Sequence, residues 1–118
     1  MTDPVSQEES SGYTATVLHA YLQLPETPSK ASSNDRQTAA TLHARSVSLF
    51  AVESALLLAS VRRLTRSPDM PPLSPIRSLA YFLPVIQEVL NNPISEDYLH
   101  YLRIKLRSFN ARNKVAAK

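Results

Sequence analysis

Residues 72–109 read PLSPIRSLAYFLPVIQEVLNNPISEDYLHYLRIKLRSF, and this stretch decides the fold of the chain. Its apolar residues recur every three or four positions, a spacing that is typical of amphipathic helices and unlike the alternation of a half-buried strand. Ser74 and Ser95 each precede such a run, so we predict that both serines cap helices. Pro75 would then take the first helical position, where a missing N–H costs nothing. The stretch predicts two amphipathic helices followed by a basic end.

The first of these helices contains Pro84, which cannot donate a backbone hydrogen bond and whose ring clashes with the preceding turn. We therefore predict either a kink or two short helices that meet near Leu83. The second helix, after Ser95, is expected to bury one apolar face of residues at helical spacing. The residues of that face are Tyr98, Leu99, Leu102, Leu106 and Phe109.

Upstream of this stretch, residues 49–66 are apolar on nearly every side of a helical wheel. Such a helix is normally wrapped by others, so we predict that it forms the centre of the fold, with Ser48 as its N-cap. Residues 35–44 are predicted to form a helix that Asn34 caps, with Gln37 as the partner in a capping box. Propensity alone leaves open whether this helix and the central one are continuous, and we favour two helices joined by a tight turn.

A short helix over residues 14–24 is also predicted. Glycine occurs once, at Gly12, and most of the nine prolines lie between apolar segments, which leaves little support for tight β architecture. The predicted fold class is therefore all-α, a small bundle of four to five helices around the central leucine-rich helix, with a disordered amino terminus. The predicted domains are a disordered tail over residues 1–12, a helical domain over 13–110 and a basic tail over 111–118.

Composition excludes several classes of protein. The chain has no cysteine, which rules out disulfides, thiolate zinc sites and cysteine nucleophiles. The amino terminus carries no basic region followed by an apolar run, so we expect no secretory leader. The longest apolar run, residues 49–61, is shorter than the roughly 20 residues of a membrane-spanning helix. We therefore expect a cytoplasmic protein without a membrane partner.

No group of residues has the spacing of a catalytic or metal site, so we expect no enzyme, metal, cofactor or small-molecule substrate. The histidines lie far apart, and the position of His100 four residues after Glu96 is more typical of a surface contact than of a metal ligand or base. Glu53 is the most unusual carboxylate, because apolar residues surround it on the wheel. It is either an acid in a pocket that perturbs its pKa or, as we expect, one partner of a structural ion pair. Its candidate partners are Arg77, Arg63 and Arg45.

Charge is distributed unevenly, although the net charge is only +3. No acidic residue follows Asp97, and the last fifth of the chain is cationic. Such an end favours DNA or RNA as a partner, although a solvated terminus would have the same composition. Contacts with nucleic acid are expected from the carboxyl half of the last helix, mainly to backbone phosphates. The predicted contact residues are Arg103, Arg107, Arg112 and Lys114.

Three large side chains fall outside the predicted buried faces of the last two helices. Tyr101 and Ile104 do so on the last helix, and Tyr81 does so on the helix before it. They predict a second interface, for another subunit or for a second copy of the chain. The alternative is that a small bundle covers both sides of these helices.

Residues 51–90, AVESALLLASVRRLTRSPDMPPLSPIRSLAYFLPVIQEVL, and residues 98–106, YLHYLRIKL, resemble one family of bacterial proteins. The resemblance is to the carboxyl-terminal helical region of replication-initiator-like helix-turn-helix proteins encoded by plasmids and mobile elements. The shared features are a leucine-rich helix that ends in paired arginines, the proline loop of residues 67–74, residues 76–79 with Tyr81 and Phe82, and the final helix over residues 98–106. The resemblance implies a role in a DNA-linked process, and no catalytic residue can be carried over from it.

The charge and the resemblance together predict a non-enzymatic helical accessory module in plasmid or mobile-element replication, or in its control. Such a module would bind nucleic acid mainly through backbone phosphates. The alternative is a protein-protein interaction or oligomerisation module with no nucleic-acid role, for which Tyr81, Tyr101 and Ile104 are the supporting residues.

Overall fold

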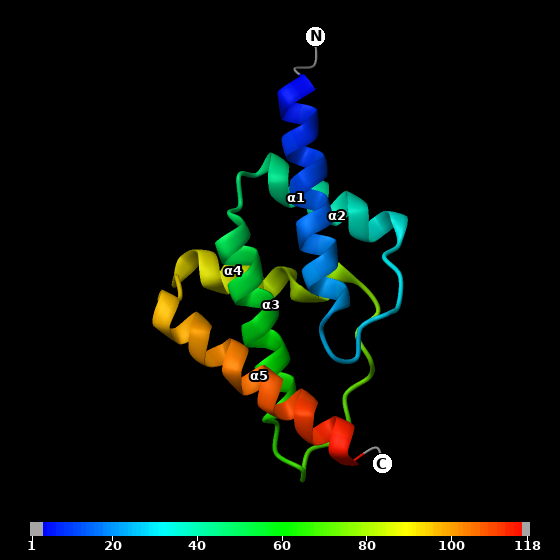
Figure 1. Cartoon of the computed structure of the whole chain (residues 1–118), viewed down its shortest axis with the longest axis vertical. Helices are drawn as coiled ribbons and strands as arrows, with labels where there is room; N and C mark the ends of the chain where they lie inside the picture. Colours follow the sequence, from blue (N-terminus) through cyan, green and yellow to red (C-terminus); the bar gives the residue numbers. More distant parts are fainter. Residues whose placement is uncertain (1–3, 117–118) are drawn as a thin grey trace.

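The computed structural model describes the backbone of residues 4–116 and the side chains of residues 11–109. Residues 4–116 contain helices, turns and loops but no strand, which confirms the predicted all-α fold class. Five α-helices and one short 3₁₀ helix follow one another within these residues (Figure 1). Their bounds are α1 Pro4–Leu22, α2 Ser33–Ala44, α3 Leu49–Leu64, η1 Leu79–Phe82, α4 Leu83–Asn91 and α5 Glu96–Ala116.

Helix α3 is the centre of the fold, as its all-round hydrophobicity predicts. It packs against α1, α4, α5 and η1, and Figure 1 shows it running through the middle of the molecule. Every side chain from Ala51 to Val61 except that of Glu53 is buried. Burying one leucine or valine side chain contributes about 1.5–3 kcal/mol, and among the described residues α3 buries more apolar side chains than any other helix.

Helices α2 and α3 are separate, as predicted, and a tight turn joins them. Ser46 has a positive φ of 60° and ends α2 in the left-handed conformation. The N–H of Val47 donates to the carbonyl of Leu42 at 3.1 Å, and the N–H of Ser46 donates to that of His43 at 2.9 Å, which together form a Schellman motif. The hydroxyl of Ser48 then accepts from the N–H of Ala51 at 3.1 Å, which confirms its predicted role as the N-cap of α3.

The predicted cap of α2 is wrong by two positions. Ser32, not Asn34, is the N-cap, and Asp35 rather than Gln37 completes the capping box. The hydroxyl of Ser32 accepts from the N–H of Asp35 at 3.1 Å, while the Asp35 carboxylate accepts from the N–H of Ser32 at 3.0 Å. The second carboxylate oxygen of Asp35 accepts from the N–H of Leu79 at 2.9 Å, a contact that favours this register and that local sequence does not show.

The predicted helix start at Ser74 and Pro75 is also wrong. The chain has no helical structure from Pro71 to Ser78, and helical structure resumes only at η1. Tertiary contacts outweigh the local signal, because Ile76 is buried and its N–H donates to the carbonyl of Glu26 at 2.9 Å. Of the two outcomes predicted at Pro84, the second is confirmed: two short helices, η1 and α4, meet at Leu83, and Pro84 lies in the first turn of α4.

Helix α1 is longer than the predicted helix at its amino end and ends two residues earlier. Its helical backbone begins at Pro4, within the segment that the sequence assigns to a tail. Among the described side chains of α1, Tyr13, Val17 and Tyr21 are buried, at the four-residue spacing of one helical face. Packing of α1 in the described part therefore begins at Tyr13, where the sequence places the start of the helical domain.

Candidate functional site

Helix α5 presents its outer side to solvent. Its N-cap is Ser95, as predicted, whose hydroxyl accepts from the N–H of Tyr98 at 3.1 Å. Leu99, Leu102 and Leu106 are buried where α5 crosses α3, which confirms those three members of the predicted buried face (Figure 1). Tyr98 was predicted in that face but is 45% exposed, because it lies beside the stripe that the three leucines form on α5 and not within it.

The exposed flank of α5 carries three large side chains, which we call the tyrosine face. Tyr101 is 49% exposed and Ile104 is 51% exposed, so both predicted interface residues of this helix face solvent in the isolated chain. The rings of Tyr98 and Tyr101 stack, with centroids 5.8 Å apart and planes inclined by 16°. The tyrosine face consists of Tyr98, Tyr101 and Ile104.

The predicted phosphate-binding residue Arg103 is held by Glu53 of α3. Its Nε donates to the glutamate Oε1 at 3.0 Å, and its Nη2 donates to the same oxygen. None of the partners predicted for Glu53 is correct, because only the packing of α5 on α3 brings Arg103 beside it. Both side chains are about 40% exposed, at 43% for Arg103 and 40% for Glu53, so solvent screens the pair and its contribution to stability is about 0.2–1 kcal/mol.

The other predicted phosphate-binding residues follow Arg103 along α5. Arg107 is exposed, and it forms no ion pair with the side chains of residues 11–109. The backbone of α5 continues through positions 112 and 114, but the side chains of Arg112 and Lys114 lie outside the described residues. Arg107 is therefore exposed to solvent, whereas Arg103 forms an ion pair with Glu53 within the fold.

A second polar cluster surrounds the guanidinium of Arg63, whose side chain is only 7% exposed. It donates to the carboxylate of Glu26 at 2.6 and 3.1 Å, to the carbonyl of Ser74 at 2.9 Å and to the hydroxyl of Tyr81 at 3.0 Å. Burial lowers the pKa of Arg63, but the hydrogen bonds to Glu26 and Tyr81 outweigh this effect and raise it. Arg63 thus fastens the α1–α2 connection and the proline loop to the end of α3.

The predicted interface residue Tyr81 belongs to this cluster and not to the tyrosine face. It lies on η1, is 43% exposed and has the guanidinium carbon of Arg63 5.4 Å from its ring centroid. A pocket of about 440 Å³ opens beside it. We call this the arginine pocket, and its walls are Ala59, Arg62, Arg63, Arg66, Leu73, Tyr81 and Val85.

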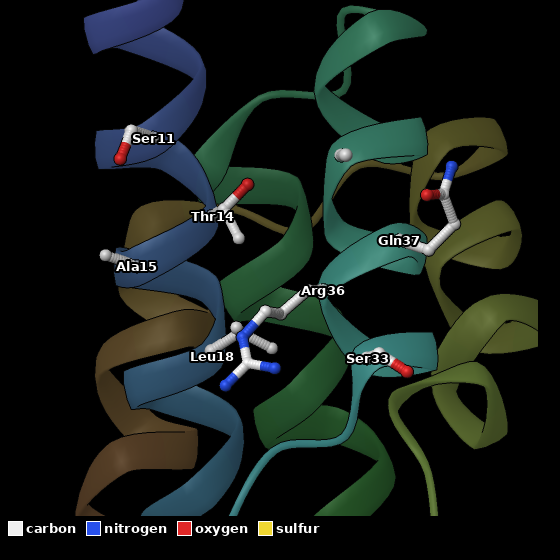
Figure 2. A pocket seen from close by; sticks show the side chains of 8 residues that line it. Ser11, Thr14, Ala15, Leu18, Ser33, Arg36 and Gln37 are labelled. Atoms are coloured by element: carbon white, nitrogen blue, oxygen red, sulfur yellow. The ribbon is translucent and has the colours of Figure 1, made fainter.

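An open groove of about 720 Å³ also lies between α1 and α2. Figure 2 shows the side chain of Arg36 reaching from α2 toward Leu18 of α1, beside Thr14. The described residues that line this groove include no carboxylate and no histidine, so they offer no pair of acid and base. The lining residues are Ser11, Thr14, Ala15, Leu18, Ser33, Arg36, Gln37 and Ala40.

The described residues contain no cluster of three or more histidine, aspartate or glutamate side chains that could hold a metal ion. Across the same part of the chain, no helix combines the length and the apolar character that crossing a bilayer requires. The features that distinguish this molecule are therefore the tyrosine face of α5 and the arginine pocket. Comparison with protein-family models, with curated proteins and with solved structures gives no match for this chain.

Proposed function

We propose that this chain is a non-enzymatic helical binding module that recognises another protein through the tyrosine face of α5. The observation that carries the proposal is the exposure of Tyr98, Tyr101 and Ile104 on one flank of a single helix. Exposed aromatic side chains that gather on one surface are typical of protein interfaces, where tyrosine is among the residues that contribute most to affinity.

The tyrosine face is also held in place before a partner binds. The leucines of α5 pack on α3, and the Arg103–Glu53 pair ties the middle of the helix to the same support. The stacked rings of Tyr98 and Tyr101 restrict each other, so less side-chain freedom is lost when a partner covers them. A rigid aromatic surface of this kind favours binding at a low entropic cost.

The proposal is tested by comparing partners that copurify with the full chain and with two variants. Tyr101→Ala and Ile104→Ala should each weaken the binding of a purified partner by about 10-fold or more, because each removes an anchor of the surface. Arg107→Ala is the matched control on the same helix and should leave that affinity within about twofold. Equal binding by all variants would show that the partner uses another surface.

A second candidate function is binding to nucleic acid through backbone phosphates, in support of plasmid or mobile-element replication. The exposed side chain of Arg107 and the continuation of the α5 backbone through positions 112 and 114 support it, together with the absence of acids after Asp97. Three such cations would give a slope of log K against log salt of about −2 to −3. Arg107→Ala should make that slope less negative by about 1, and removal of residues 111–118 should reduce its magnitude further. No binding at low salt would exclude this function.

A further inference from the structure

The arginine pocket combines a positive charge with an apolar wall, and neither is explained by the tyrosine face. The last turn of α3 and the residues beyond it place three guanidinium groups around one hollow. The residues opposite are Leu73 of the proline loop, Tyr81 of η1 and Val85 of α4. Leu73 is 42% exposed beside these cations, so its side chain is accessible to a molecule that enters the hollow.

Two of the three guanidinium groups are neutralised by carboxylates. Arg62 donates two hydrogen bonds of 2.8 Å to Glu88, and Arg63 donates to Glu26. Arg66 differs, because among the described residues it forms no ion pair and its Nη1 donates to the neutral backbone carbonyl of Pro71. A guanidinium group has five N–H donors, so Arg66 retains donors for a further acceptor.

Tyr81 provides a second donor in the same hollow. Its hydroxyl oxygen accepts a hydrogen bond from Arg63, so its own proton remains to be donated. Arg63 is nearly buried and is held by several bonds, which fixes the position of this hydroxyl. The walls are also stiff, because Pro71 and Pro72 restrict the loop that carries Leu73.

We propose that the arginine pocket binds a small organic anion in which one carboxylate or phosphate group is joined to an apolar body. Arg66 and the Tyr81 hydroxyl receive the anionic group, since a guanidinium fork matches the paired oxygens of both anions. Leu73, Val85 and Ala59 contact the apolar body. The arginine pocket and the tyrosine face share no residue, so the two proposals can fail separately.

The test is an NMR titration of the full chain at constant ionic strength, with phenyl phosphate, phenylacetate and uncharged phenylacetamide as probes. At least one of the two anions should shift the amide signals of Ala59, Leu73 and Val85 saturably, and the tighter of them identifies the preferred anionic group. Phenylacetamide should bind at least about 10-fold more weakly. Inorganic phosphate should also bind more weakly than phenyl phosphate, because it lacks the apolar body.

Substitutions of the proposed donors test whether these side chains bind the anion. Arg66→Gln should weaken the preferred anion by about 10-fold and Tyr81→Phe by about threefold. Arg77→Gln removes an exposed arginine that does not line the pocket, and it should change the affinity less than about twofold. Thermal melting of each variant establishes that it folds. The proposal is overturned if neither anion binds saturably, if the amide binds equally well, or if the folded Arg66→Gln chain binds as tightly as the parent.

Discussion

Asp35 of α2 accepts a hydrogen bond from the backbone N–H of Leu79, 44 positions later in the chain, with 2.9 Å between the two atoms. The carboxylate is only 1% exposed, and its other oxygen caps α2 through Ser32. One side chain therefore stabilises the start of α2 and fixes the start of η1 on it. Without this bond, the N–H of Leu79 would be buried without a partner.

Replacement of Asp35 should therefore be among the most destabilising single changes to a polar residue. Asp35→Ala removes the bonds to Ser32 and Leu79 and should lower the free energy of unfolding by about 2–4 kcal/mol in a urea titration. Asp35→Asn keeps one acceptor oxygen, so a loss of about half that size is expected. Asp69→Ala, at an exposed acid of the proline loop, is the control and should change stability by less than about 0.5 kcal/mol. A similar loss in both alanine variants would contradict this role of Asp35.

Arg63 should be far more important for stability than its neighbour Arg62. Arg63→Ala would remove the bonds to the carbonyl of Ser74 and the carboxylate of Glu26, which water can then solvate, and would remove the nearly buried arginine side chain that holds the proline loop, at a cost of about 1–2 kcal/mol. Arg62 is about half exposed, at 52%, so Arg62→Ala should cost much less. Denaturant unfolding of both variants measures the difference, and equal losses would show that burial of Arg63 has no special role.

The buried hydroxyl of Tyr21 should make the folded protein less stable at alkaline pH. Its hydroxyl is buried and has no hydrogen-bond partner, and burial, together with the charge of Asp35, raises the pKa of Tyr21 to about 12. The unfolded tyrosine loses its proton near pH 10, before the folded one does, so this contribution is present below pH 10 and is lost as the pH rises toward 12. Tyr21→Phe should reduce that dependence, and the part that remains comes from Tyr13, whose pKa burial also raises.

The same variant tests the cost of the unpaired hydroxyl. At pH 7, Tyr21→Phe should leave stability unchanged or raise it by about 1 kcal/mol, because no hydrogen bond is lost. Unfolding curves of both chains between pH 7 and pH 12 provide the measurement. A loss of more than about 1 kcal/mol at pH 7 would mean that the hydroxyl has a partner in solution.

The ion pair of Arg62 and Glu88 should lose its stabilising effect at acid pH, whereas the contribution of Tyr21 is lost at alkaline pH. The hydrogen bonds from Arg62 lower the pKa of Glu88 below its ordinary value of 4.5. The stabilisation from this pair is therefore complete above pH 4.5 and is lost as the pH falls through the lowered pKa. Glu88→Gln should flatten this part of the acid unfolding profile, whereas Glu96→Gln, at an exposed acid of α5, should leave it in place.

The sequence alone is sufficient to predict the helices whose formation depends on local signals. The serine caps at Ser48 and Ser95 are confirmed, and so is the central position of α3, because a helix that is apolar all round has to be surrounded. The errors arise where distant residues decide the outcome. Ser74 and Pro75 have the pattern of a helix start, but burial of Ile76 and its bond to Glu26 keep that segment out of a helix.

In the candidate sites, too, local sequence predicts some features, and contacts between distant residues decide the others. The exposure of Tyr101 and Ile104 follows from helical spacing and was predicted, whereas the pairing of Arg103 with Glu53 depends on how α5 crosses α3. The role of Asp35 had a partial signal, because Ser32 and Asp35 have the spacing of a capping box. Its bond to Leu79 had no local signal.

The most direct test of the proposed function is site-specific photocrosslinking in cells, with a photoreactive phenylalanine at position 101. The proposal predicts one discrete crosslinked protein product at this position, and no such product when the probe replaces Ala15 in the groove between α1 and α2. If position 101 gave no protein product, or crosslinked only to nucleic acid, the tyrosine face would not be a protein-binding surface.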